Sequence, residues 1–240
     1  EASDDNYYMS GTHFYYHSAD PIIVKTKPNG EVVWAKTYNQ NLRTSSFVKI
    51  LNTSDNNVLV MGVNDYTIDH EGTDSVMLMK LNYNGEVLWA KNYSGGIDHS
   101  NMTDIVASDN GDFFMMVTGN SYTLVSRINL NGNIVWQKEI RNYAGGPIFR
   151  SITCNDKNIF LAGDNFFSDG LLTTIKLDAA TGNYIWAKTI SFDNFLPIIR
   201  AVETIADTIF VFYTLNPTGS VNNNNLAMLK LHAVSGNVID

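Results

Sequence analysis

The stretch at residues 77–93, MLMKLNYNGEVLWAKNY, decides the fold of this chain. It consists of two short apolar runs that flank the dipeptide Asn84-Gly85. Asn-Gly supplies the two positive-φ positions of a type I′ turn and is the strongest short-range signal for a β-hairpin. The stretch therefore predicts two antiparallel strands, with Trp89 in the second of them.

The same pattern recurs along the whole chain at a period of about 50 residues. Its other copies are residues 22–38, 124–140, 173–190 and, incompletely, 227–240. The tryptophans follow one another at spacings of 55, 47 and 50 residues, and a basic residue precedes each tryptophan by nine or ten positions. The repeated residues that we expect to build the structure are Trp34, Trp89, Trp136, Trp186, Gly30, Gly85, Gly132 and Gly182.

Each repeat holds two further strands ahead of the hairpin. In the second repeat these are the apolar runs at residues 47–51 and 56–63, which precede the hairpin strands at 75–81 and 86–93. The second and third strands are apolar on both faces, which is typical of a sheet packed between two neighbouring sheets. Four-stranded antiparallel sheets that repeat and pack face to face predict a β-propeller.

The sequence thus predicts an all-β propeller in which about five four-stranded antiparallel blades are represented. The expected blades cover approximately residues 1–40, 41–95, 96–145, 146–194 and 195–240, and the first and last are incomplete. Two interpretations of the incomplete blades remain open. The chain is expected to be part of a larger propeller, and the alternative is an imperfect five-blade ring.

Composition excludes several classes of function. A formal net charge of −8 argues against a nucleic-acid surface, which needs clustered Lys and Arg. No apolar run approaches the roughly 18 residues of a membrane span, so direct membrane insertion is not expected. Cys154 is the single cysteine and cannot form an intrachain disulfide. The five histidines show no zinc-type spacing, and no nucleophile elbow or phosphate loop occurs. We therefore predict no catalytic residue, no metal ligand and no cofactor.

The repeated residues have two possible roles. The tryptophans could be sugar platforms, but a tryptophan repeated at one strand position is expected to pack between adjacent blades. The repeated Lys and Arg residues could form a basic channel, but we expect them to lie along apolar neighbours or to pair with carboxylates.

The loops that follow the second strand differ from blade to blade and are the place where function can vary. They carry exposed aromatic candidates, which would gather on one face of the propeller and suit contact with a protein or a glycan. The alternative is that these rings fold back over the ends of the blades. The candidate interaction face consists of Phe14, Tyr15, Tyr16, Tyr66, Phe166 and Phe167.

Two related groups of proteins share these repeats. Residues 176–189, KLDAATGNYIWAKT, resemble the repeat of pyrroloquinoline-quinone-type propellers, in which an Asp, a Thr-Gly and a Trp recur. Residues 89–119 resemble still more the Trp-Lys-Tyr-Gly-Gly repeats of bacterial secreted and cell-surface propellers. The resemblance implies the fold and an extracellular or cell-envelope location, while its motif residues are structural.

The leading functional prediction is a non-catalytic scaffold that mediates protein–protein interaction in a secreted or cell-surface protein. Its partners would be other proteins or neighbouring domains of a longer chain, with a glycan as another possible ligand. A carbohydrate-binding propeller is the first alternative. A quinone-dependent dehydrogenase is the second, against which stand the single cysteine and the lack of an evident cofactor site.

Overall fold

A computed structural model describes residues 5–15, 18–38, 46–64, 74–97, 102–119, 121–141, 146–165, 170–193, 195–217 and 225–239. The chain divides into two compact units. The first contains residues 1–99 with 130–133, and the second contains residues 100–129 with 134–240. Within the described ranges every regular element is a strand, and there is no helix that could span a membrane.

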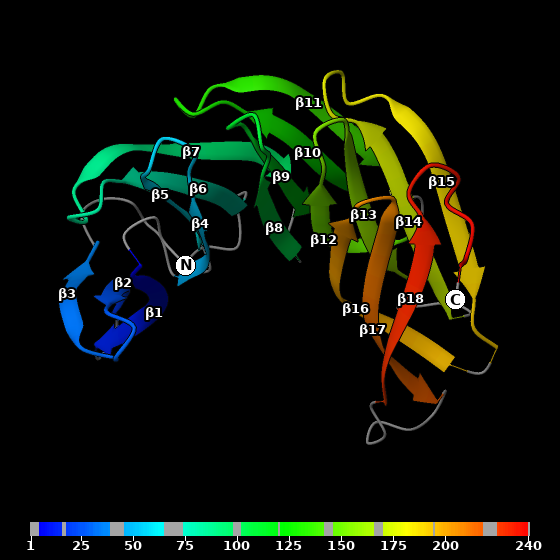
Figure 1. The fold of residues 1–240 in the computed structure, drawn as a ribbon, viewed down its shortest axis with the longest axis horizontal. Coiled ribbons are helices and arrows are strands. Elements are labelled where there is room, and N and C mark those ends of the chain that lie inside the picture. The colour runs from blue at the N-terminus through cyan, green and yellow to red at the C-terminus, as the bar shows by residue number, and fades with distance from the viewer. Residues whose placement is uncertain are drawn as a thin grey trace. The chain divides into compact units, whose positions relative to one another are not determined.

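The first unit holds one three-stranded and one four-stranded sheet, each built from consecutive strands (Figure 1). The three-stranded sheet has the order β1 (Tyr7–Tyr15), β2 (Ser18–Thr26) and β3 (Val32–Thr37). The four-stranded sheet has the order β4 (Ser46–Asn52), β5 (Val58–Asn64), β6 (Asp74–Leu81) and β7 (Val87–Ile97).

The second unit holds three sheets with the same consecutive order. The first of them contains β8 (Met102–Ala107), β9 (Phe113–Thr118), β10 (Tyr122–Ile128) and β11 (Ile134–Arg141). The second contains β12 (Ile148–Cys154), β13 (Asn158–Asp164), β14 (Leu171–Asp178) and β15 (Tyr184–Ser191). The third contains β16 (Phe195–Ile205), β17 (Thr208–Pro217) and β18 (Asn225–His232).

The predicted all-β propeller of antiparallel blades is confirmed. The register repeats from sheet to sheet, because the basic residue of the third strand faces the tryptophan of the fourth. Lys25 pairs with Trp34, Lys80 with Trp89, Arg127 with Trp136 and Lys176 with Trp186.

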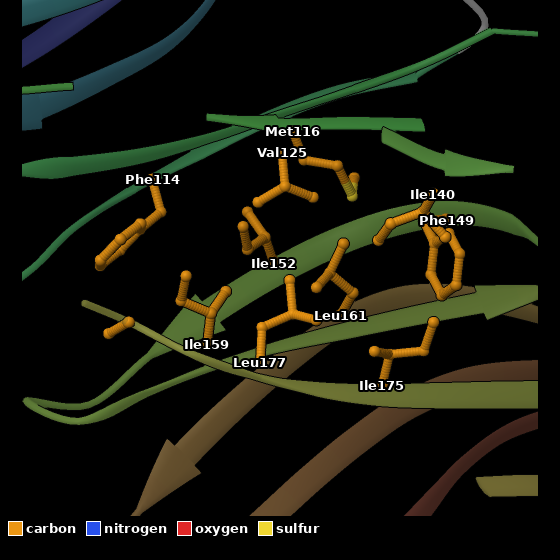
Figure 2. Packing of buried hydrophobic residues seen from close by; sticks show 11 residues of the cluster. Phe114, Met116, Val125, Ile140, Phe149, Ile152, Ile159, Leu161, Ile175 and Leu177 are labelled. Atoms are coloured by element: carbon orange, nitrogen blue, oxygen red, sulfur yellow. The ribbon is translucent and has the colours of Figure 1, made fainter. Parts of the chain in front are cut away.

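The core lies between neighbouring sheets. In the second unit, Phe114, Met116 and Val125 of one sheet point toward Phe149, Ile152 and Leu161 of the next (Figure 2). These six side chains are at most 3% exposed. Burying apolar surface contributes about 25 cal/mol per Å², so the packing of one sheet on the next is the main source of stability.

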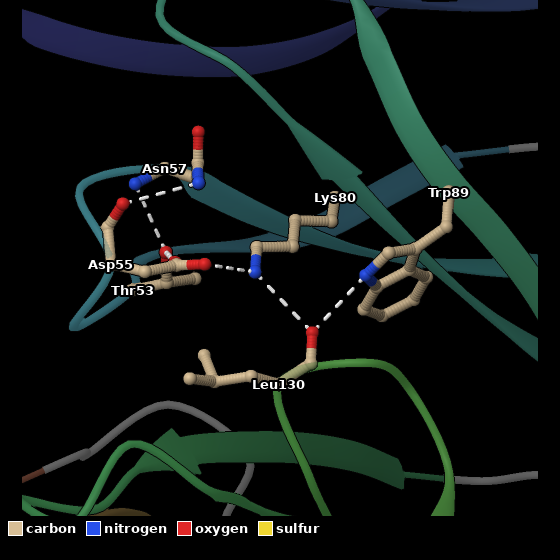
Figure 3. Close-up of polar contacts among 6 residues, drawn as sticks. All are labelled: Thr53, Asp55, Asn57, Lys80, Trp89 and Leu130. Atoms are coloured by element: carbon tan, nitrogen blue, oxygen red, sulfur yellow. Dashed lines mark hydrogen bonds and ion pairs between the residues drawn. The ribbon is translucent and has the colours of Figure 1, made fainter.

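The outer edges of the sheets meet through a repeated polar contact. The ammonium of Lys80 and the indole Nε1–H of Trp89 both donate to the carbonyl oxygen of Leu130, at 3.3 and 3.1 Å (Figure 3). Leu130 lies in the turn that joins β10 and β11. One carbonyl oxygen has two lone pairs and can accept both bonds.

The same contact is found in three other places. Lys25 and Trp34 donate to the carbonyl of Tyr83, and Arg127 and Trp136 donate to that of Ala179. Lys176 and Trp186 use the neighbouring carbonyls of Ala233 and Val234. The basic residues were expected to lie along apolar neighbours or to pair with carboxylates, and the turn carbonyl is the partner that they share.

Two of these basic residues also pair with a carboxylate. Lys80 lies 2.5 Å from Asp55 and Arg127 lies 2.6 Å from Asp112. Burial by itself would raise the pKa of Asp55, but hydrogen bonds from Lys80 and Thr53 outweigh it and hold the pKa below its usual value.

Tyrosines extend the contact in the first unit. The hydroxyl of Tyr38 donates to the carbonyl of Gly85 at 2.9 Å, and that of Tyr93 donates to the carbonyl of Gly132 at 2.8 Å. Burial raises the pKa of both phenols to about 12, with a smaller contribution from Tyr8 in the case of Tyr38. Both hydroxyls therefore remain donors at physiological pH.

The turn glycine is required for two reasons. Gly85 has a φ of 71°, and a Cβ placed on it would lie 2.9 Å from the ring of Trp34 and from the hydroxyl of Tyr38. Gly30 has the same kind of backbone, with a φ of 85°, but a Cβ there would meet nothing within 4 Å. A side chain at either position would strain the backbone, but only a side chain at position 85 would also clash with Trp34.

The pair Gly30→Ala and Gly85→Ala tests the tryptophan contact. Alanine at positive φ costs roughly 1 kcal/mol, which we expect for Gly30→Ala. Gly85→Ala should lose about 2–4 kcal/mol, because overpacking against Trp34 adds about 1–3 kcal/mol. Urea unfolding midpoints measure both variants. Equal losses would show that the tryptophan does not constrain the turn.

Candidate functional site

The first strand of three sheets carries a β-bulge at the same place. The register shifts between Phe47 and Lys49 in β4, between Phe149 and Ser151 in β12, and between Ile199 and Ala201 in β16. Bulges redirect a side chain and are over-represented next to active sites. The bulged residues are Val48, Arg150 and Arg200, so two guanidinium groups stand at equivalent positions of neighbouring sheets in the second unit.

Arg150 binds the most deeply buried carboxylate of this region. Its Nε and Nη2 donate to the two oxygens of Asp164, whose side chain is fully buried at the end of β13. The backbone N–H of Ile199 donates to the same carboxylate at 3.0 Å. A bidentate guanidinium neutralises the buried charge, and the third bond joins β13 to the first strand of the next sheet.

A second polar chain crosses three sheets. Asp104 of β8 accepts hydrogen bonds from the Ser151 hydroxyl at 3.1 Å and from the Ile152 N–H at 3.0 Å. The Ser151 oxygen in turn accepts the N–H of Val202 in β16 at 3.2 Å. The first strand of a sheet is an edge, so its outward N–H groups need partners, and the side chains of the preceding sheet supply them.

These two carboxylates hold the sheets together. A general acid or base has to reach the proton of a substrate, directly or through one water. Asp164 is fully buried and bound by Arg150, and Asp104 accepts two bonds from the next sheet. Both groups therefore position the inner strands. Arg200 is exposed, and its Nη2 donates to the Thr214 hydroxyl at 3.3 Å.

A carboxyl pair lies at the turns between first and second strands. Asp109 forms a side-chain hydrogen bond with Asp156, and that bond, together with the repulsion of the two charges, raises the pKa of Asp109. Glycoside cleavage needs two carboxyl groups separated by about 5 Å or more. A carboxyl pair joined by a hydrogen bond is too close together to flank a glycosidic bond.

Cys154 lies near that pair and is unsuited to nucleophilic chemistry. Burial raises the pKa of its thiol to about 12, and the charges of Asp109, Asp156 and Glu203 add to the effect. The thiol contacts the Ala107 carbonyl at 3.5 Å. The thiolate is the reactive form, so the raised pKa makes this cysteine a poor nucleophile at neutral pH.

The sequence-predicted interaction face lies almost wholly beyond the described structure. Phe14 and Tyr15 belong to the last residues of β1, where only the backbone is described. Tyr16, Tyr66, Phe166 and Phe167 lie outside the described residues. That face remains a prediction. Among the repeated residues, the indole of Trp136 lies against Gly182 and that of Trp89 against Gly132.

Sequence reasoning missed the inner polar residues. Arg150 and Arg200 each interrupt an apolar strand, and they are one repeat apart. That recurrence was the available signal. Asp164 and Asp104 have no repeated counterpart, and their partners include backbone N–H groups that no sequence pattern identifies.

Comparisons with known proteins support the fold but assign no sequence family. No model of a known protein family matches the sequence, and no curated protein matches it. The resemblance to quinone-type and Trp-Lys-Tyr-Gly-Gly propellers is therefore shown only at the level of the β-propeller fold.

Several solved structures are similar to this chain. An exo-β-1,3-galactanase from Phanerochaete chrysosporium with bound β-1,3-galactotriose matches at a TM-score of 0.54 and 12% identity, over 95% of this chain and 61% of that one. A GH43_1 enzyme from Xanthomonas citri complexed with xylose matches at 0.50 and 10%, over 99% and 88%. Drosophila Plexin A in complex with Semaphorin 1b matches at 0.51 and 10%, over 95% and 53%.

These matches correct the leading functional prediction. At 10–12% identity the likeness shows the fold, and the chain spans about three fifths of the galactanase. The glycosidases among the matches nevertheless contradict the expectation of a non-catalytic scaffold for protein partners, and with it the expectation that the chain is not an enzyme. The error arose because the repeated residues that dominate the sequence are structural. From their structural role we inferred that the whole chain is non-catalytic.

Asp164→Asn tests the buried ion pair. Removing one charge of a buried pair leaves the other uncompensated, so we expect a loss of about 3–5 kcal/mol in the free energy of unfolding. The matched control is Glu139→Gln, which removes the exposed pair with Arg141 and should cost no more than about 1 kcal/mol. A loss for Asp164→Asn as small as that of the control would contradict the structural role.

The Cys154 thiol provides a second test. With its pKa raised to about 12, it should react with a disulfide reagent at pH 8 far more slowly than a free thiol. Unfolding in urea should restore the ordinary rate. Rapid labelling of the native protein would show that the inner strand is open at this point.

Proposed function

We propose that this chain is the propeller of a carbohydrate-active protein and that it binds a saccharide. The observation that carries the proposal is the likeness to propellers whose structures contain a saccharide, β-1,3-galactotriose in one case and xylose in another. The sequence resemblance to secreted and cell-surface propellers is consistent with it, and we propose an extracellular or cell-envelope location.

The surface charge favours a neutral ligand. A net charge of −8 disfavours anionic polysaccharides through long-range repulsion. The ligands in the two similar glycosidase structures, a galactotriose and xylose, are uncharged sugars. A neutral oligosaccharide of hexose or pentose units therefore fits the charge of the chain better than a uronate or a sulfated glycan.

The aromatic residues that follow the second strands are the proposed contacts. Aromatic rings offer a large apolar face, and tyrosine adds a hydroxyl, so they suit the C–H faces and hydroxyl groups of a sugar. Tyr15 and Phe166 belong to two different repeats, so we choose them to represent two of these loops.

Binding to neutral oligosaccharides tests the proposal. β-1,3-Galacto-oligosaccharides and xylo-oligosaccharides are titrated into the chain and followed by calorimetry. Each lost ring contact should cost about 1 kcal/mol or more, so Tyr15→Ala and Phe166→Ala should each weaken binding about fivefold to tenfold. Tyr184→Ala is the matched control, because that ring lies exposed on the outer strand β15 and should not affect affinity.

The outcomes separate three cases. No binding to either oligosaccharide or to a broad glycan array would overturn the proposal. Binding that survives both loop substitutions would place the ligand elsewhere on the propeller. Chromatography of the incubated oligosaccharides shows whether binding is accompanied by hydrolysis.

A further inference from the structure

Arg150 has one guanidinium edge that the buried ion pair does not use. A guanidinium carries five N–H groups, and the side edge of Arg150, formed by Nε and Nη2, binds the Asp164 carboxylate. The end edge, formed by Nη1 and the second N–H of Nη2, donates to no described residue. Among the described residues, the buried polar atoms without a partner do not include Nη1, so solvent reaches this edge.

Arg127 offers a comparison within the second unit. Its Nε binds the carboxylate of Asp112, and its Nη1 donates to the carbonyl of Ala179 in the next sheet. The side chains of Arg127 and Arg150 are similarly covered, at 19% and 14% exposed. Arg127 therefore uses both edges of its guanidinium for the fold, whereas Arg150 binds Asp164 with one edge and keeps the other for a further acceptor.

The bulge and the ion pair hold the free edge in one orientation. Arg150 is the extra residue at the β-bulge of β12, and a bulge redirects its side chain. Two parallel bonds to Asp164 then fix the plane of the guanidinium, and the N–H of Ile199 holds Asp164 in turn. A donor pair that is already ordered loses little conformational freedom when it binds a ligand.

The ion pair lies at the end of the sheet from which an aromatic loop leaves. β13 ends at Asp164, and Phe166 follows after one residue. The backbone N–H of Asn165 donates to the carbonyl of Leu171 at 3.0 Å and closes the base of this loop. Arg150 is therefore bound to the strand that leads directly into one of the proposed sugar-binding loops.

The buried carboxylate decides which class of ligand fits the free edge. Asp164 already neutralises the charge of Arg150, so a second anion gains little net attraction there. The remaining N–H groups keep their direction, and two parallel donors suit two neighbouring oxygen acceptors. Hydroxyl groups on adjacent carbons of a sugar ring provide such a pair of acceptors without a charge.

We propose that Arg150 contacts the saccharide, and that its free edge donates two hydrogen bonds to neighbouring hydroxyl groups of a neutral sugar unit. Asp164 is then the positioning residue that orients the donor and cancels its charge. This inference rests on the proposed function, because it assigns a polar contact to the same saccharide site that the aromatic loops serve.

Arg150→Lys tests the contact. Lysine keeps a positive charge opposite Asp164 but cannot donate two parallel bonds from a planar group. In calorimetry, binding of β-1,3-galacto-oligosaccharides or xylo-oligosaccharides should weaken about tenfold or more, because hydrogen bonds from a charged donor are lost. Arg127→Lys is the matched control, since it makes the same change at an ion-paired arginine whose partners all belong to the protein, and it should leave affinity unchanged. Urea unfolding midpoints show whether both variants remain folded.

Nitrogen NMR of the arginine side chains in the parent chain gives a readout that needs no variant. A saturating oligosaccharide should shift the Nη resonances of Arg150, because its free edge then donates to sugar oxygens. The resonances of Arg127 should stay in place. An Arg150 with a purely structural role would show no such shift, and this measurement decides the question if Arg150→Lys does not fold.

The outcomes separate this inference from the proposed function. A parent chain that binds neither oligosaccharide would overturn both. Binding by the parent chain that is unchanged in a folded Arg150→Lys, or equally weakened in Arg127→Lys, would overturn the role of Arg150 alone. Methyl β-galactoside and methyl β-galacturonide test the ligand class, and tighter binding of the charged sugar would contradict the assignment to a neutral one.

Discussion

A backbone carbonyl in an outer turn accepts hydrogen bonds from the preceding sheet at three turns, and two neighbouring carbonyls do so at a fourth. The tryptophan indole and the basic side chain of one sheet converge on this oxygen, as Trp89 and Lys80 do on Leu130. The convergence works only if the turn brings its carbonyl outward, and the positive φ of the following glycine provides that geometry. The indole ring then lies directly on the glycine, so the same residue sets both the turn and the spacing between sheets.

The inner strands depend on a different set of contacts. There the sheets are joined by side chains that satisfy edge N–H groups of the next sheet, as Asp104 does for Ile152 and Asp164 for Ile199. Thr118 plays the reciprocal part by donating to the Phe149 carbonyl at 2.9 Å. The outer contact is made by the tryptophans of four successive sheets, whereas the inner contacts change identity from sheet to sheet. Functional variation along the inner strands is therefore possible without loss of the outer framework.

The fold could be predicted because its signals are local and repeated. Asn84-Gly85 predicts its hairpin, and Trp89 four residues later lies where the register places it. The partner of Lys80 could not be predicted, because it is a backbone carbonyl 50 residues away in sequence. Arg150 and Asp164 were missed because they lie on two paired strands, β12 and β13, and no sequence pattern identifies the bulge at Arg150. The function was mispredicted because structural residues dominate the repeat and the aromatic loops carry no repeated pattern.

The central claim is that the tryptophan of one sheet and the glycine turn of the next form one unit. A double-mutant cycle of Trp136→Ala and Gly182→Ala tests it, with unfolding free energies from urea denaturation. An added Cβ at Gly182 would lie 2.9 Å from the Trp136 ring, so the alanine should cost much less once the ring is gone. We predict that the double variant loses about 1–3 kcal/mol less than the sum of the single losses. Additive losses would contradict the account, because they would mean that the ring and the turn stabilise the protein independently.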